Sequence, residues 1–217
     1  MGYWSILASS APYGRHPAVA IEASQKNFQI LLMNSQANNG RFIAIHRAVL
    51  DEAGKQVQLH GTRHYSMSLR KDWHPIEDVH VETDNSNTEE VESITIDLAA
   101  EVYLPNPQYP ALIKIDVEGL EIEAVKGARH LIEEGALFIY EDHGTEATHA
   151  ASRFVFCLQG VDVWHVAPDR GPARITKIEQ VSAIKQDARM GYNFFAHKRA
   201  SPWSSLFESE RASIATT

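Results

Sequence analysis

Residues 111–128, ALIKIDVEGLEIEAVKGA, decide the fold. In the first half of this stretch, branched apolar side chains alternate with charged ones, which is typical of a buried strand that ends in polar residues. Gly119 allows the backbone to turn, and the apolar residues that follow recur at helical spacing until Gly135. The stretch therefore predicts a strand, a short loop and one continuous helix.

Lys114, Asp116 and Glu118 occupy every second position at the end of this predicted strand, so they project from one side of it. In open α/β sheets, ligands bind beyond the carboxyl ends of the strands. We therefore predict a reaction centre here, in which Asp116 and Glu118 serve as general base or as orienting acceptors. The alternative is a structural ion pair with Lys114, and the residue types alone do not separate the two.

Elsewhere in the chain, strand patterns alternate with helix patterns. We expect further strands at 18–22, 41–50, 56–59, 91–96, 136–140, 161–166 and 192–197, and helices at 28–38, 97–103 and 145–158. Residues 62–87 show no clear period, and the Ser-rich tail from residue 200 is expected to be loose. The predicted fold class is α/β, with a mainly parallel sheet, helices on both faces and a last strand that enters antiparallel.

The composition is that of one ordinary soluble domain, with 217 residues of which 44% are hydrophobic and 22% charged. A net charge of -8 argues against a nucleic-acid partner, because such proteins concentrate Lys and Arg on a basic face. No apolar run is long enough for a membrane span, and no signal peptide is evident. The lone Cys157 has apolar neighbours, which predicts a core residue and fits a reduced cytoplasm.

Two further strand ends carry acids. Glu22 ends the first predicted strand, where an α/β nucleotide-binding fold places a carboxylate that accepts hydrogen bonds from a ribose diol. Its alternative role is that of a solvated acid. Glu141, Asp142 and His143 follow the predicted strand 136–140 and could complete an acidic site or bind a divalent cation through oxygen ligands.

Taken together, these segments resemble the FkbM-type family of S-adenosylmethionine-dependent methyltransferases. The run LIKIDVEGLEIEAVKGA at 112–128 carries most of the resemblance. Supporting segments, in matching order from residue 2 to about 199, are AIEAS at 20–24, NSQANNG at 34–40, RAVLDEAG at 47–54, ITIDL at 94–98 and FIYEDHG at 138–144. A nicotinamide-dependent oxidoreductase is disfavoured because the chain contains no GxGxxG.

The resemblance implies a Rossmann-like class I methyltransferase fold over residues 1–199, with an insertion at about 55–93 and a tail at 200–217. It implies that S-adenosylmethionine donates a methyl group in line to a hydroxyl of a small molecule or carbohydrate. The cofactor would be held by Gly2, Ser5, Glu22 and Ala48. The hydroxyl proton would go to Asp116 first, with Glu118 second and His143 as a possible alternative.

The chain departs from the family at its start, where only the end of the glycine-rich first loop, Gly2 to Ser5, is present and the first strand is missing. A missing strand would expose a neighbouring sheet edge, which makes a homo-oligomer plausible, and would remove backbone donors for the cofactor. The second hypothesis is therefore a non-catalytic Rossmann-like module, a binding or structural domain derived from a methyltransferase.

Overall fold

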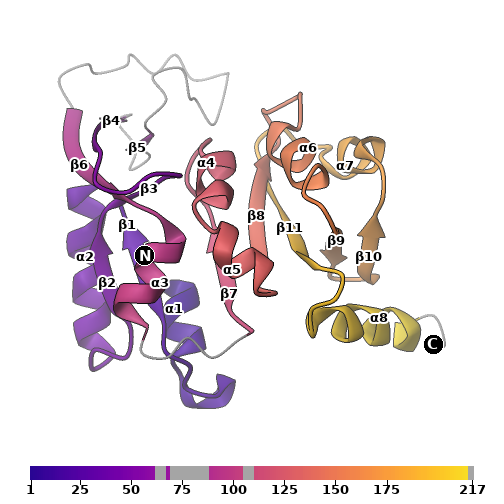
Figure 1. Cartoon of the computed structure of the whole chain (residues 1–217), viewed down its shortest axis with the longest axis horizontal. Helices are drawn as coiled ribbons and strands as arrows, with labels where there is room; N and C mark the ends of the chain where they lie inside the picture. The colour runs from indigo at the N-terminus through magenta and orange to yellow at the C-terminus, as the bar shows by residue number, and fades with distance from the viewer. Residues whose placement is uncertain (62–66, 69–87, 105–109, 215–217) are drawn as a thin grey trace. The chain divides into compact units, whose positions relative to one another are not determined.

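The computed structural model describes residues 1–61, 67–68, 88–104 and 110–214. These residues form two compact units, coloured along the chain in Figure 1. The first takes its described residues from Met1–Trp73, His80–Pro107 and Val117–Ala128, and the second from Gln108–Asp116 and Arg129–Thr217. Most of the predicted insertion, at 62–66 and 69–87, lies outside the described residues.

The first unit begins with two short helices and a parallel strand pair. Helix α1 (Tyr3–Ala8) and the 3-10 turn η1 (Ala11–Tyr13) precede β1 (Val19–Glu22), which pairs in parallel with β2 (Ile43–His46). Helix α2 (Gln25–Ala37) packs against both strands, and its Leu31 is 2% exposed (Figure 1). The predicted strand and helix are confirmed. Among the described residues, β1 is the first strand along the chain.

A second sheet of the first unit has the order β3-β6-β4-β5. Its strands are β3 (Ala48–Val49), β4 (Gln56–Gly61), β5 (Met67–Ser68) and β6 (Thr88–Ile94). Strand β6 runs parallel to β3 and antiparallel to β4. It leads into α3 (Ile96–Tyr103), whose first turn is capped by the Thr95 hydroxyl, which accepts from the Leu98 amide at 3.1 Å. The strand predicted at 41–50 is therefore divided, with β2 and β3 in different sheets.

The helix predicted after Gly119 is not continuous. It is divided into α4 (Glu121–Lys126) and α5 (Arg129–Glu133). The break falls at Gly127, whose carbonyl accepts a hydrogen bond from the Asp97 amide at 2.9 Å. A Cβ atom on Gly127 would lie 2.2 Å from the Leu50 carbonyl oxygen. Close backbone approach, which glycine alone permits, explains why the helical pattern of the sequence is interrupted here.

The second unit is built on a five-stranded sheet of order β10-β9-β11-β8-β7. Its strands are β7 (Leu112–Ile115), β8 (Leu137–His143), β9 (Val161–Ala167), β10 (Gly171–Ile175) and β11 (Gly191–Lys198). Only β7 and β8 are parallel, because β9 and β10 form a hairpin and β11 enters antiparallel between β8 and β9. The antiparallel last strand is confirmed. The mainly parallel sheet is not confirmed, because the two larger described sheets are mixed and only the β1–β2 pair is purely parallel.

Strand β7 lies at one edge of this sheet. Ile113 and Ile115 are buried, with 9% and 1% exposure, but Leu112 is 56% exposed. The prediction of a buried strand therefore holds for one face of β7. The deepest side chains belong to the next strands, where Phe138, Tyr140 and Phe194 are each 0% exposed.

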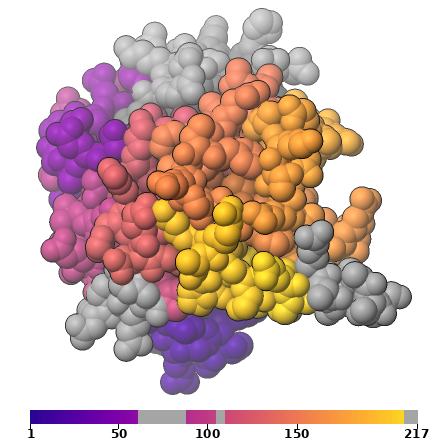
Figure 2. All heavy atoms as spheres, turned by 45° about the vertical axis from the view of Figure 1, so that its right-hand side comes forward, coloured from indigo at the N-terminus to yellow at the C-terminus, as the bar shows by residue number. Residues whose placement is uncertain are grey.

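Besides α5, the described part of the second unit contains the helices α6 (Ala150–Phe156), α7 (Ile178–Ile184) and α8 (Trp203–Ile214). The expectation of a loose tail is wrong, because α8 packs on the sheet through Phe207, which contacts Leu137 and Trp164. Figure 2 shows this helix at the surface of the unit. Cys157 is exposed rather than part of the core, since it lies at the end of α6. Among the described residues, no helix is long and apolar enough to cross a bilayer.

Candidate functional site

Glu22 lies at the carboxyl end of β1, just before α2. Its Oε1 atom accepts a hydrogen bond from the Ser24 amide at 2.9 Å. Burial raises the pKa of Glu22 above the ordinary value, against the opposing effect of hydrogen bonds from the Ser24 and Ala23 amides. The side chain is thus partly desolvated and held in one direction by the backbone, unlike a freely solvated strand-end acid.

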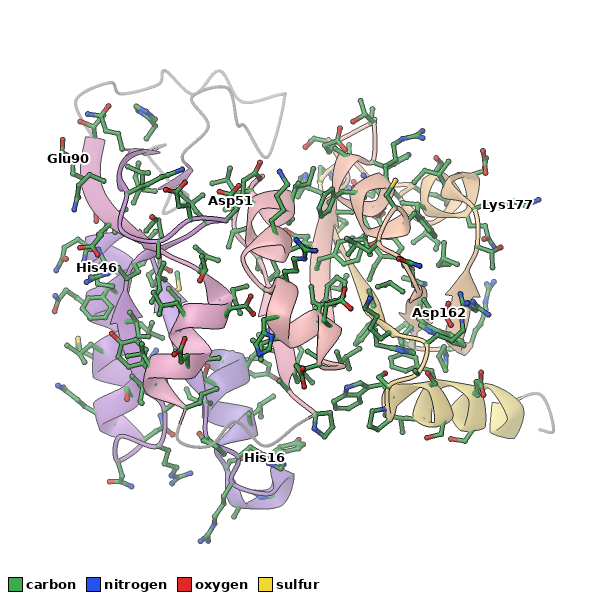
Figure 3. All side chains as sticks on the ribbon, in the orientation of Figure 1. His16, His46, Asp51, Glu90, Asp162 and Lys177 are labelled. Carbon is green, nitrogen blue, oxygen red and sulfur yellow. The ribbon has the colours of Figure 1, made fainter. Side chains whose placement is uncertain are left out.

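His46 and Glu89 surround this carboxylate. His46 is paired with Glu22 in the parallel register, and its Nε2 lies 2.9 Å from the Ala23 carbonyl oxygen. Because a carbonyl only accepts, Nε2 carries a proton. The ring stacks on Phe28 of α2 at 5.1 Å, and Figure 3 shows it beside that helix. Glu89 Oε1 lies 3.5 Å from His46 Nε2.

Glu89 comes from β6 and also accepts a hydrogen bond from the Gln25 amide in the first turn of α2. A negative charge is favourable there because the first amides of a helix lack partners within it. Glu89 raises the pKa of Glu22 further, while His46 lowers it. Sequence reasoning missed both residues. The parallel pairing of neighbouring strands could have indicated His46, but nothing in the sequence connects Glu89 with residue 22.

Gly2 and Ser5, the other predicted cofactor residues near the start, are not brought to Glu22. Gly2 packs against α2 and Phe42, and a Cβ atom on it would lie 3.1 Å from the Phe42 ring. Phe42 precedes β2, so Gly2 is at the amino end of this strand pair and Glu22 at the carboxyl end. Ser5 lies within α1, where its carbonyl accepts from the Ser9 hydroxyl at 2.7 Å.

Ala48 is a core residue with 3% exposure. It packs in a cluster with Leu59 and Val91, and Ala23 contacts the same cluster. The cluster that contains Ala48 therefore contacts Ala23, the residue that follows Glu22. The cofactor roles of Gly2, Ser5, Glu22 and Ala48 stay predictions.

Asp116 follows β7 directly, in the second unit. Its Oδ2 lies 3.3 Å from Lys114 Nζ, which also donates to the Ile115 carbonyl at 3.1 Å. This contact is the ion pair that the sequence left open as an alternative. The Asp116 side chain is nevertheless 51% exposed, so a carboxylate oxygen remains accessible to another donor.

Glu118 belongs to the first unit, whereas Asp116 belongs to the second. Its φ is 51°, in the left-handed region, and the next residue, Gly119, also has a positive φ of 93°. An L-residue in this region costs about 1–2 kcal/mol. Such strain is often kept at functional sites, and Glu118 is one of four non-glycine residues with positive φ in the described part of the chain.

His143 is the last residue of β8. Its Nδ1 accepts a hydrogen bond from the Thr145 amide at 3.2 Å and contacts the Thr145 hydroxyl at 2.8 Å. A neutral ring that accepts at Nδ1 carries its proton on Nε2. In this arrangement His143 would have to change tautomer before Nε2 could act as a general base.

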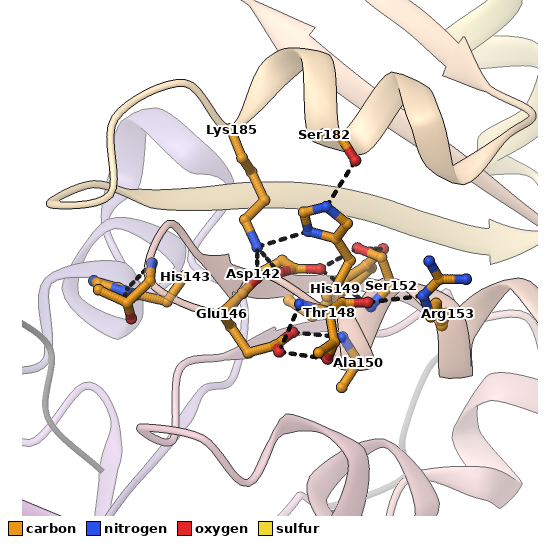
Figure 4. A network of polar contacts seen from close by, with 12 residues as sticks. Asp142, His143, Glu146, Thr148, His149, Ala150, Ser152, Arg153, Ser182 and Lys185 are labelled. Atoms are coloured by element: carbon orange, nitrogen blue, oxygen red, sulfur yellow. Dashed lines mark hydrogen bonds and ion pairs between the residues drawn. The ribbon is translucent and has the colours of Figure 1, made fainter.

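Glu141, Asp142 and His143 do not combine into one acidic cluster. Asp142 is 2% exposed and bonds to Ser152 and Lys185 (Figure 4). His143 instead bonds to Thr145. Successive side chains of a strand point to opposite faces, so Asp142 points away from the face that Glu141 and His143 share. Within the residues that the structure describes, no group of three His, Cys, Asp or Glu side chains is arranged to hold a metal ion. The predicted divalent-cation site is therefore not formed at this strand end.

Comparison with known proteins gives one match. A family model described as the methyltransferase FkbM domain matches residues 2–162. No curated protein and no solved structure matches the chain. The match covers most of the chain and includes Glu22, Asp116, Glu118 and His143. The chain therefore belongs to the FkbM methyltransferase family.

Proposed function

We propose that the protein is an S-adenosylmethionine-dependent O-methyltransferase that acts on a hydroxyl of a small molecule or sugar. The family match over residues 2–162 is the observation that carries this proposal. The cofactor would supply an activated methyl group bound to a sulfonium. The residues of this chain would bind the cofactor, orient the hydroxyl and accept its proton.

The surroundings of Glu22 fit the ribose of such a cofactor. A carboxylate has about four acceptor positions and no donor, which suits two hydroxyl groups. Backbone amides of Ala23 and Ser24 use part of this capacity and fix the direction of the side chain. Hydrogen bonds from ribose hydroxyls to the ionised carboxylate would each contribute about 1.5–3 kcal/mol.

Asp116 is the proposed acceptor of the hydroxyl proton. Its carboxylate is half exposed, lies past the last residue of a strand, and is held from one side by Lys114. A general base of this kind contributes about 10²–10⁴-fold to a rate. A larger share, about 7–11 kcal/mol, would come from holding the hydroxyl oxygen in line with the methyl group.

Calorimetric titration of the full chain with S-adenosylmethionine and with S-adenosylhomocysteine tests the cofactor part of this proposal. We expect saturable one-to-one binding of both, with adenosine alone binding more weakly because it lacks the methionine portion. If neither compound binds, the enzyme proposal fails. The non-catalytic module would then be favoured, and the Asp116–Lys114 contact would be a structural ion pair.

A further inference from the structure

A buried lysine joins three segments of the second unit. Lys185 directly follows α7, and its side chain is 1% exposed. Its ammonium contacts Asp142 Oδ1, the Glu146 carbonyl oxygen at 2.7 Å and His149 Nδ1 at 3.0 Å (Figure 4). Because an ammonium has three N–H donors, these contacts use all of them. Lys185 thus ties the end of α7 to β8 and to the loop after it.

The other side of Asp142 is equally occupied. Its Oδ2 accepts from the Ser152 hydroxyl at 2.5 Å and from the Ser152 amide at 3.3 Å. The Tyr140 hydroxyl contacts the Ser152 hydroxyl at 3.2 Å, and burial raises the pKa of Tyr140. The Asp142–Lys185 ion pair is therefore enclosed in a satisfied hydrogen-bond network. Such a network fixes one arrangement of its members, since a buried charge without its partner is costly.

His149 is the titratable partner in this network. Because its Nδ1 accepts from the ammonium, the neutral ring carries its proton on Nε2, which lies 2.7 Å from the Ser182 hydroxyl. Burial lowers the pKa of His149, and the charges of Lys185 and Arg153 lower it further. Asp142 and Glu146 act in the opposite direction. A second proton would sit on Nδ1 and face the ammonium, so charged His149 is incompatible with this contact.

Residues 185–190 also contact the loop 144–149 through backbone atoms, at Asp187 and at Met190. The Gly144 amide donates to the Met190 carbonyl at 2.9 Å. A Cβ atom on Gly144 would lie 2.3 Å from the Asp187 carbonyl oxygen, so the two backbones touch. Gly144 immediately follows His143, and the Thr145 amide that orients His143 belongs to the same loop. The supporting segment lies beyond the family match, which ends at residue 162.

We propose that Lys185 is a positioning residue: through Asp142, Glu146 and His149 it holds the loop 144–149, and thereby His143, in one conformation. The contact between the Lys185 ammonium and His149 requires the uncharged ring. Protonation of His149 in acid therefore frees the loop 144–149. The significance of the hold for turnover rests on the proposed function, but the hold itself is a property of the folded chain.

The test compares a double variant, Lys185→Met with Asp142→Asn, with the wild type. The double variant removes both charges, so no unpaired charge stays buried. The matched control is Lys198→Met. Lys198 is the last residue of β11 in the same sheet, and its ammonium contacts Glu133 of α5 at 2.8 Å. Nitrogen chemical shifts of the His143 ring report its tautomer, and amide hydrogen exchange reports the opening of residues 144–149.

We expect the wild type and the control to show the Nε2–H form of His143. The double variant should show averaged tautomers and exchange that is faster by about tenfold or more in the loop. Unchanged His143 shifts and loop exchange in a folded double variant would overturn the proposal. Lys185→Arg, which keeps the charge but not the compact ammonium, should fall between the two.

Acidification gives the second readout. Because the folded state lowers the pKa of His149 from 6.5, stability from this network is present above that value and is lost as the pH falls below it. The protection factors of the loop amides in the wild type, which compare exchange with the intrinsic rate at each pH, should fall in that window. His149→Asn keeps an acceptor and tolerates the positive φ of 54°, but it cannot titrate, so the acid step should disappear. An acid step that persists in this variant would contradict the role of His149.

Cofactor affinity and kcat, measured in the wild type and in the double variant, distinguish a failure of the Lys185 proposal from a failure of the proposed function. If the wild type binds S-adenosylmethionine, the double variant should bind it with similar affinity and lose about tenfold or more in kcat. A double variant with displaced His143 and full kcat would overturn a role in catalysis. If the wild type binds no cofactor, the proposed function fails, whereas the His143 spectra and loop exchange still decide whether Lys185 holds the loop.

Discussion

Two Asp–Lys pairs lie at the ends of neighbouring strands, and they differ in how far the aspartate is exposed to solvent. Asp116, after β7, contacts Lys114 at 3.3 Å and is 51% exposed. Asp142, near the end of β8, contacts Lys185, and both side chains are 1% exposed. The first pair joins residues two positions apart, and the second joins residues 43 positions apart.

The two carboxylates differ in whether an oxygen stays accessible to a substrate. Asp142 has both oxygens bonded inside the unit, so it can stabilise a conformation but cannot approach a substrate. Asp116 has one oxygen in contact with Lys114 and an exposed surface. An acid at a strand end is therefore a candidate for chemistry only after its burial and partners are known.

The largest expected difference is in stability. Lys185→Met leaves Asp142 buried without its counter-charge and should lower the free energy of unfolding by about 3–5 kcal/mol. Lys114→Met leaves Asp116 in water and should lower it by less than about 1 kcal/mol. Urea denaturation of both variants measures the two values. Similar losses in the two variants would contradict the division into a structural pair and an accessible one.

The next effect concerns turnover. Asp116→Asn should reduce the rate by about 10²-fold or more, because an amide cannot accept the hydroxyl proton. Lys114→Met breaks the same contact and keeps the carboxylate, so it should retain most of the rate. Initial rates with saturating S-adenosylmethionine provide the comparison. Equal losses would mean that the contact, rather than the carboxylate, is what the enzyme needs.

A smaller effect is expected at Glu118. Glycine relieves the positive φ of 51° but gains freedom in the unfolded chain, so Glu118→Gly should change the unfolding free energy by less than about 1 kcal/mol in either direction. If the side chain takes part in the reaction, the rate should fall while the melting temperature does not. A variant that melts normally and keeps its full rate would limit Glu118 to a turn residue.

Local sequence patterns predicted those elements whose signals lie within a few residues. Alternation and helical spacing located β1, α2, α3, β9 and β11, and the acid at the end of β1 was found from its position alone. Strand β10 and helix α7 were not predicted. The serines and charges of residues 200–217 predict a loose tail, whereas Trp203 and Phe207 of α8 pack on the sheet.

What the sequence could not predict depends on contacts between distant segments. The break at Gly127 follows from its contact with the Leu50 carbonyl, and nothing local to the helix pattern indicates it. The burial of Asp142 depends on Lys185, which follows a helix that was not predicted. The approach of Glu89 to α2 likewise joins residues separated by 64 positions. In each case the missing information is tertiary, because propensity and periodicity describe one element at a time.

The central claim, that this chain binds S-adenosylmethionine through Glu22, is tested most directly by titrating S-adenosylhomocysteine into Glu22→Gln and Glu90→Gln. Glutamine at 22 keeps an acceptor for the Ser24 amide but loses the charge that would bind the ribose hydroxyls. Glu90 is an exposed acid on β6, next to Glu89, and serves as the matched control. We predict wild-type affinity for Glu90→Gln and affinity weakened by about tenfold or more for a folded Glu22→Gln, in line with the loss of about 1.5–3 kcal/mol for a hydrogen bond to a charged group. Equal affinity of the two variants would contradict the account.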